Sequence, residues 1–125
     1  MLVQDRITRA DLRANPGSLY LFGDNHARVG MGGQAAQMRG EPNAVGVRTK
    51  WRPTTADDAY FRDEDLEVVV PMILDDLRPA FVHAAAGGVV VVPAAGLGTG
   101  LAGLPRTAPR VHAFLEAQLA ALGRL

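Results

Sequence analysis

The chain has 125 residues, of which 48% are hydrophobic and 21% charged, with 13 basic and 13 acidic residues and no cysteine. This composition is typical of a globular protein and excludes a disordered one, and the length predicts a single domain over residues 1–125. The absence of cysteine excludes a disulfide framework, a thiolate zinc site and a cysteine nucleophile. The balanced charge does not favour nucleic acid as a partner.

Short apolar segments separated by turn residues predict alternating strands and helices in the first half of the chain. The expected elements are, in order, a weak edge strand over Leu2–Ile7, a short helix capped by Thr8, a buried strand over Leu19–Phe22, a helix over Gln34–Arg39 and a strand over Ala44–Val47. The segment after them, Pro53–Asp63, is polar and irregular. We expect it to cross over one end of the sheet.

One long helical pattern follows this crossover. Its N-cap is expected at Asp63 or Asp65, whose carboxylates favour a helix N-terminus. Pro71 lies inside the pattern and predicts a kink or a later start. Pro79 predicts a break, with a second helical piece over Ala80–Ala86.

The last third of the chain contains a second buried strand and a final helix. Val89–Val92 is β-branched throughout and predicts the strand, and Leu104-Pro105 begins the helix. Strands that alternate with helices predict an α/β fold, here a three-layer α/β/α sandwich with a mainly parallel central sheet. Ligands of such sheets bind at the carboxyl ends of the strands.

Two glycine-rich turns each follow an apolar strand and precede an expected helix. Glycine permits positive φ and close approach of backbone N–H groups to a ligand, and a helix start adds unpaired N–H groups and positive dipole. Two such turns at one sheet edge make a cleft suited to phosphate or pyrophosphate. The candidate ligand-binding residues of the turns are Gly30, Met31, Gly32, Gly33, Gln34, Gly96, Leu97, Gly98, Thr99, Gly100 and Leu101. The alternative is that these glycines only make tight turns.

The second turn also matches the spacing G-x-G-x-x-G over Gly98–Gly103. A dinucleotide-binding fold would need an acidic residue about twenty positions later at a strand end. Glu116 lies instead inside an expected helix, so the match does not predict a dinucleotide fold. The motifs of a nucleophile elbow and of a P-loop are absent from the sequence, so neither acyl transfer nor P-loop chemistry is favoured.

Polar residues at two strand ends are the candidates for chemistry. Asp24 and Asn25 follow the first buried strand and are expected to point into the ligand crevice, although they can instead cap the loop. Lys50 follows the next strand, with Arg48 and Arg52 on the same face of an extended segment. This basic trio can bind phosphate or form a solvated surface, and a buried lysine beside a glycosidic carbon can act as a nucleophile. The candidate catalytic residues are Asn25, Lys50 and Asp24, and we expect no metal site and no cofactor.

Two segments together resemble the macrodomain superfamily. They are Leu21-Phe22-Gly23-Asp24-Asn25 followed by Gly30–Gly33, and the strand and loop over Val90–Leu101. The resemblance implies ADP-ribose or an ADP-ribosylated substrate as the partner. It implies that Asp24 or Asn25 contacts adenosine or the distal ribose, that Gly30–Gln34 covers the distal ribose, and that Gly96–Leu101 binds the phosphates.

The chain departs from this family at positions that matter for catalysis. Many hydrolytic macrodomains carry an aspartate just after the first glycine run, where this chain has Gln34-Ala35-Ala36. Another branch pairs a strand-end lysine with an aspartate in the second loop. Lys50 matches the lysine, but the loop reads Gly100-Leu101-Ala102 and has no carboxylate. Recognition of the ligand is therefore implied more strongly than its cleavage.

Three hypotheses follow. The first is binding of ADP-ribose or a related nucleotide diphosphate, with cleavage of ADP-ribosyl linkages as its catalytic variant. The second is a phosphatase or nucleotide-processing enzyme that uses the same cleft. The third is a non-catalytic protein-interaction domain whose glycine loops are only turns. The sequence lacks an apolar run of the ~18 residues that a membrane span needs and an apolar leader at its start, so we expect a cytoplasmic protein.

Overall fold

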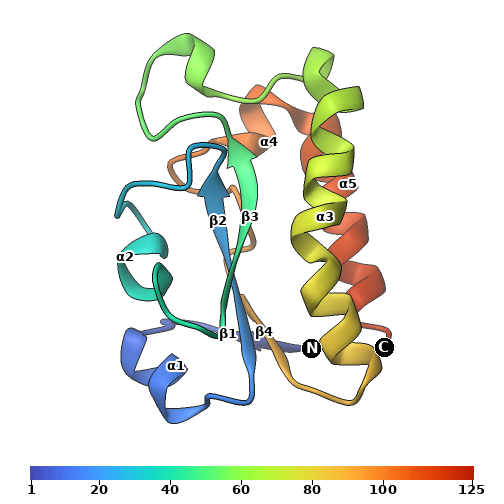
Figure 1. The fold of residues 1–125 in the computed structure, drawn as a ribbon. Coiled ribbons are helices and arrows are strands. Elements are labelled where there is room, and N and C mark those ends of the chain that lie inside the picture. The colour runs from blue at the N-terminus through green and yellow to red at the C-terminus, as the bar shows by residue number, and fades with distance from the viewer.

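A computed structural model describes residues 1–125 (Figure 1). Its elements are, in order, β1 (Leu2–Gln4), α1 (Arg9–Ala14), β2 (Leu19–Asn25), α2 (Ala35–Met38), β3 (Ala44–Lys50), the 3-10 turns η1 (Asp57–Ala59) and η2 (Asp63–Asp65), α3 (Leu66–Ala85), β4 (Val90–Pro93), α4 (Leu104–Thr107) and α5 (Pro109–Leu122). None of the helices has the length and apolar character needed to span a membrane.

The four strands form one all-parallel sheet in the order β1-β4-β2-β3, which confirms the predicted parallel α/β arrangement. Tyr20 of β2 lies opposite Ala44 of β3 on one side and Val91 of β4 on the other. β1 is an edge strand as predicted, but it ends at Gln4. β2 and β3 extend past their apolar runs to Asn25 and Lys50, because backbone pairing continues between them. The polar residues at these two strand ends are therefore held within the sheet.

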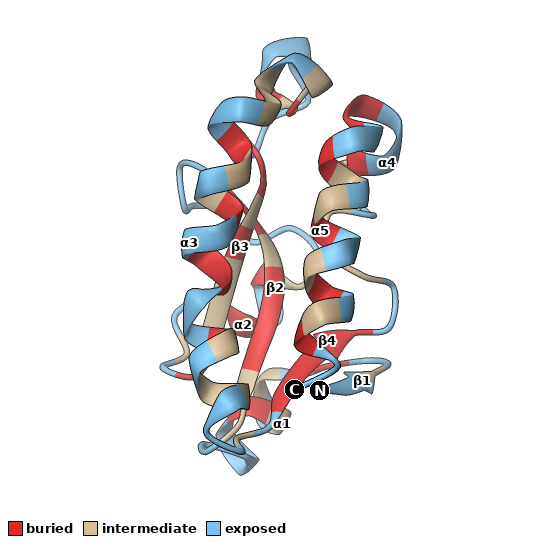
Figure 2. Cartoon of the chain, turned by 90° about the vertical axis from the view of Figure 1, so that its right-hand side faces the viewer, coloured by how far each residue is buried: buried red, intermediate tan, exposed pale blue.

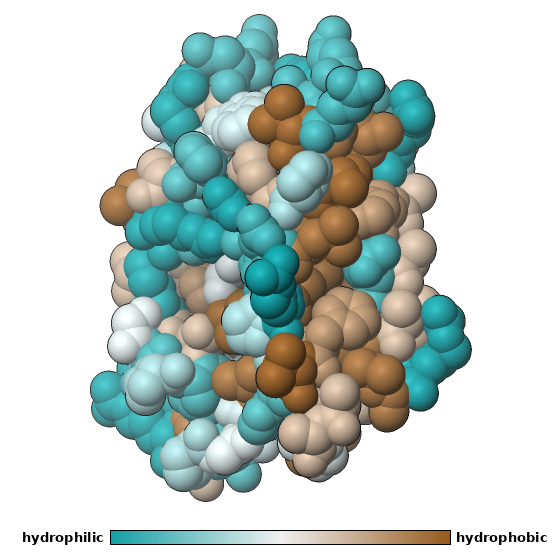
Figure 3. Space-filling view, turned by 45° about the vertical axis from the view of Figure 1, so that its right-hand side comes forward, coloured by the Kyte–Doolittle hydropathy of each residue, from teal (hydrophilic) through white to brown (hydrophobic).

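Helices pack on both faces of the sheet because successive side chains of each strand point to opposite faces. Leu21 belongs to a cluster of 16 buried residues on the side of α3 and α5, whereas Tyr20 and Phe22 belong to a cluster of 7 on the side of α1 and α2. Figure 2 shows the buried stripes of α3 and α5 turned toward the strands. Figure 3 shows apolar side chains gathered on the surface of the molecule as well. Leu74 and Val82 of α3 are among the large apolar residues that are exposed. The larger core therefore lies under the two long helices.

The predicted break at Pro79 is wrong, because α3 runs without interruption from Leu66 to Ala85. Pro71 and Pro79 both lie on the exposed side of the helix. The backbone groups that lose their hydrogen bonds can reach water there. The buried stripe, which includes Ile73 and Leu77, continues past both prolines and holds the helix on the sheet.

The single last helix predicted from Leu104 is divided into α4 and α5. The division falls at Ala108, which has φ −149° and ψ 70°. Pro109 follows it, and proline disfavours the helical conformation in the residue before it. The second glycine loop is consequently followed by a single turn of helix.

Candidate ligand-binding cleft

A cavity of about 470 Å³ lies at the carboxyl ends of β2, β3 and β4, between the two glycine loops. The predicted site residues that line it are Asp24, Asn25, Gly30, Met31, Gly32, Gly33, Gln34, Lys50, Gly96, Gly98, Thr99, Gly100 and Leu101. Leu97 does not line it, because its side chain is 1% exposed and belongs to the core beneath the loop. Arg39, Thr49 and Pro53 line the cavity although sequence reasoning did not select them. The fold thus brings both loops and both strand ends to one cavity.

The glycines of the two loops have different structural roles. Gly98 has φ +74°, and a Cβ atom there would lie 3.0 Å from Thr49 and 3.1 Å from Leu104. It is therefore a packing residue, as the tight-turn alternative requires. A Cβ atom at Gly32 would lie 2.8 Å from Leu101, so the two loops meet across the cleft. Gly100 lines the cavity and has neither a positive φ nor any atom within 4 Å of its Cβ position.

Backbone amides are the main polar groups that the loops offer. The N–H groups of Gly30–Gln34 and of Leu97–Ala102 donate no hydrogen bond within the chain. Successive backbone N–H groups form a concave anion-binding surface where the residues alternate between right-handed and left-handed backbone conformations. The expected contribution of helix N-termini needs correction, because α2 and α4 have only four residues each and sum few peptide dipoles. The loops themselves therefore supply the donors.

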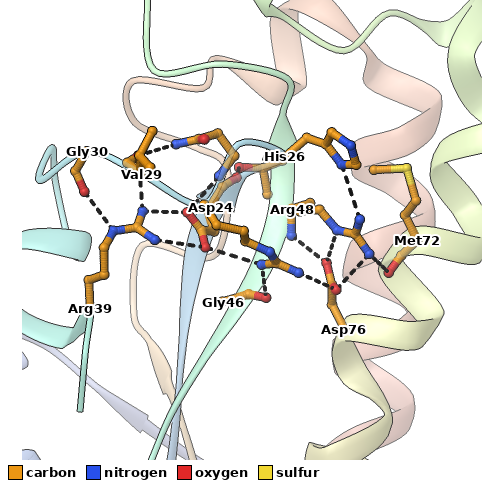
Figure 4. A network of polar contacts seen from close by, with 12 residues as sticks. Asp24, His26, Val29, Gly30, Arg39, Gly46, Arg48, Met72 and Asp76 are labelled. Carbon is orange, nitrogen blue, oxygen red and sulfur yellow. Dashed lines mark hydrogen bonds and ion pairs between the residues drawn. The ribbon is translucent and has the colours of Figure 1, made fainter.

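Asp24 is 5% exposed, and hydrogen bonds occupy both oxygens of its carboxylate (Figure 4). Oδ1 accepts from Arg39 Nη2 over 2.5 Å and from the backbone N of Asn25 over 2.8 Å. Oδ2 accepts from Arg39 Nη1 and from Arg28 Nη1, each over 3.2 Å. Two guanidinium groups thus compensate the buried charge. The carboxylate has a structural role at the end of β2, which matches the loop-capping alternative.

Asn25, unlike Asp24, has a side-chain oxygen without a hydrogen-bond partner. Its Nδ2 donates to Val29 O over 2.7 Å, whereas its Oδ1 is buried without a hydrogen-bond partner. The residue is 7% exposed and lines the cavity. A buried acceptor without a partner is costly, so a ligand that donates a hydrogen bond to it would bind favourably.

Lys50 is the one lysine of the chain, and it is 8% exposed in the wall of the cavity. Its Nζ donates to Thr54 O over 2.9 Å and lies 4.3 Å from the ring centroid of Tyr60. No carboxylate forms an ion pair with it, and burial lowers the pKa of its ammonium group. Lys50 therefore brings an uncompensated positive charge to a cleft rich in N–H donors.

The predicted basic trio is not formed. Arg48 pairs with Asp76 on α3, with Nε 2.9 Å from Oδ2, and Arg52 pairs with Asp58 on the exposed crossover. The cause is a bulge in β3, since Arg48 lies opposite Asp24 and Lys50 lies opposite the next residue of β2. The extra residue in β3 reverses the alternation of sides. Lys50 is therefore alone in the cleft.

Comparison with known proteins gives one match. No curated protein and no solved structure is similar to the chain. The model of a family of unknown function, DUF7831, matches residues 2–118. This match spans all four strands and every residue that lines the cavity. The chain therefore belongs to this family of unknown function, DUF7831.

Proposed function

We propose that the cleft binds ADP-ribose or a related nucleotide diphosphate. The observation that carries the proposal is the pair of loops whose amides donate no hydrogen bond and line one cavity of about 470 Å³. This volume falls in the range of about 300–1,000 Å³ that small-molecule sites occupy. Unpaired backbone amides are suited to the oxygens of a diphosphate.

Two side chains add to this chemistry. The ammonium group of Lys50 has no carboxylate partner, and it favours an anion over a neutral nucleoside. The free Oδ1 of Asn25 can accept a hydrogen bond from a hydroxyl group, as a ribose offers. The resemblance of both loops to those of macrodomains, and the three-layer arrangement with the sheet between helices, support ADP-ribose as the first ligand to test.

The test is calorimetric binding and thermal unfolding with ADP-ribose, beside AMP, ADP and NAD. Gly100→Glu introduces a carboxylate at a residue that lines the cleft, without positive φ or a steric clash, whereas Gly98→Glu would disturb the packing against Thr49. Gly17→Glu is the matched control, because Gly17 is equally free of neighbours and lies in the exposed turn before β2. A native-state ligand at 100 times its Kd adds about 2.7 kcal/mol to the stability.

We expect ADP-ribose to stabilise the wild type and the Gly17→Glu variant but not Gly100→Glu. The absence of any stabilisation of the wild type by a nucleotide would refute the proposal and favour the protein-interaction alternative. Stabilisation by AMP alone would place recognition at the nucleoside monophosphate. Release of phosphate from a phosphate ester of ADP-ribose would favour the phosphatase alternative.

A second candidate function is cleavage of an ADP-ribosyl linkage in the same cleft. The position of Lys50 in the cavity wall and its lowered pKa favour this function. Burial lowers the pKa of this lysine, so a larger fraction of its amine is neutral and nucleophilic at a given pH. Nζ of Lys50 would bond to the anomeric carbon as the ADP-ribosyl linkage breaks, and the released group would leave with a proton. Water oriented by Asn25 would then attack the same carbon, break the bond to Nζ and restore the free amine. Asp24 is not assigned this chemistry, because arginine side chains occupy its carboxylate. Loss of cleavage in Lys50→Ala at ligand concentrations that saturate the variant would support this role, and no cleavage by the wild type would refute it.

A further inference from the structure

Arg39 makes a set of contacts that links the buried end of β2 to the first glycine loop (Figure 4). One side of its guanidinium group binds the carboxylate of Asp24 through Nη1 and Nη2. Its Nε donates to Gly30 O over 2.8 Å, and Nη2 also donates to Val29 O over 3.3 Å. The carbon at the centre of the group lies 5.5 Å from the ring centroid of Phe22. The group is thus held by an anion, an aromatic face and two loop carbonyls.

These two carbonyl contacts determine the direction of two amides. In a planar trans peptide the C=O and the following N–H point in opposite directions, and the chain has no cis peptide bond. The carbonyl of Val29 is bound by both Arg39 and Asn25, and that of Gly30 by Arg39. The N–H groups of Gly30 and Met31 therefore point away from the guanidinium group, and they donate no hydrogen bond within the chain.

We propose that Arg39, oriented by Asp24, is the positioning residue that turns the first glycine loop into an anion-binding surface. The inference rests on the proposed function, because it concerns the donors of the same cleft. Asp24 then acts by orienting Arg39 and does not contact the ligand. This role explains why a cleft for anions contains a buried aspartate, although its negative charge would repel an anion. The planar guanidinium group binds the carboxylate and two carbonyls through three separate nitrogens, whereas the ammonium group of lysine has all its donors on one nitrogen.

The test compares the affinity of three variants for inorganic pyrophosphate and for ADP-ribose by calorimetry. Arg39→Lys keeps the positive charge and removes the planar set of donors, and Arg39→Gln removes both. Arg28→Lys is the matched control, because Arg28 also binds Asp24 Oδ2 but its other partners are Gly46 O and Asp76, not the loop carbonyls. Thermal unfolding of each variant establishes that it is folded at the temperature of the titration.

We expect Arg39→Lys and Arg39→Gln to weaken the binding of both ligands by similar factors, at least about tenfold, since hydrogen bonds to a charged group contribute on this order. The affinity of Arg28→Lys should stay within about threefold of the wild type, since its lost contacts are partly exposed. Wild-type affinity in Arg39→Lys would overturn the inference, because charge alone would then suffice. Equal losses in Arg28→Lys and Arg39→Lys would overturn it also, because any partner of Asp24 would then have the same effect.

A measurement on the wild type covers the case in which the Arg39 variants do not fold. Nuclear magnetic resonance of the amides should show that pyrophosphate slows hydrogen exchange at Gly30 and Met31 and shifts their signals downfield. Unchanged exchange and shifts at both amides, with pyrophosphate bound, would overturn the inference while the proposed function stands. If the wild type binds neither pyrophosphate nor ADP-ribose, the proposed function fails, and the inference fails with it.

Discussion

Gly98 offers the sharpest test of how the second loop is built. An alanine there must adopt φ +74°, a left-handed conformation that costs about 1–2 kcal/mol for a residue with a Cβ atom. The new methyl group would also lie 3.0 Å from Cβ and Cγ2 of Thr49 and 3.1 Å from Cβ of Leu104. Overpacking of this kind costs about 1–3 kcal/mol. We expect Gly98→Ala to lower the free energy of unfolding by about 2–5 kcal/mol.

Urea unfolding followed by circular dichroism measures this change, and Gly100→Ala is the control. Gly100 has no positive φ and no atom within 4 Å of its Cβ position, so its substitution should change stability by less than about 0.5 kcal/mol. Thr49→Ser removes Cγ2 and keeps the hydroxyl group that donates to Asp24 O, so combining it with Gly98→Ala should recover about 1 kcal/mol. Equal stability of Gly98→Ala and Gly100→Ala would refute the assignment of Gly98 to packing.

Three further predictions address side chains around the cleft. Leu97→Ala should lower the free energy of unfolding by about 2–5 kcal/mol and Leu101→Ala by less than about 0.5 kcal/mol, since Leu97 is 1% and Leu101 72% exposed; similar losses in urea titrations would contradict this. Burial lowers the pKa of Lys50 in the folded protein, so at alkaline pH the unfolded chain binds more protons at this residue than the folded chain does. The stability of the wild type should therefore rise relative to Lys50→Met as pH approaches 10.5. A difference that does not change with pH would argue against a buried lysine. Asp76→Asn, which removes the charge that two arginines share, should cost about 1–3 kcal/mol in thermal unfolding, and a neutral effect would show that this network is dispensable.

The candidate cleft was predictable in outline because its parts are local in the sequence. Apolar runs marked the strands, and clustered glycines marked the loops that follow β2 and β4. Parallel strands bring their carboxyl ends to one edge, so the meeting of the two loops followed from the order of elements. The placement of Leu97 was not predictable in this way, because its side chain packs in the core while the residues on either side of it line the cavity.

The contacts that adapt the cleft to a ligand were not predictable from local patterns. Arg39 was expected only as the end of a helix, and nothing near it in the sequence indicates a pair with Asp24, 15 positions earlier. The separation of Lys50 from Arg48 depends on a bulge whose position is set by pairing between β2 and β3. Each of these features requires two segments to be in contact, so it has no signature within one segment.

The sequence by itself therefore determined most of the elements, their order, the parallel sheet and most of the residues that line the cleft. These follow from hydrophobic periodicity and from the backbone preferences of glycine and proline, which act over a few residues. Only the tertiary structure decided which polar groups remain free in that cleft. Arginine side chains form ion pairs with the carboxylate of Asp24. Asn25 Oδ1 and the loop amides have no hydrogen-bond partner, and Lys50 has no carboxylate partner. Which of these groups finds a partner depends on every segment that packs around it.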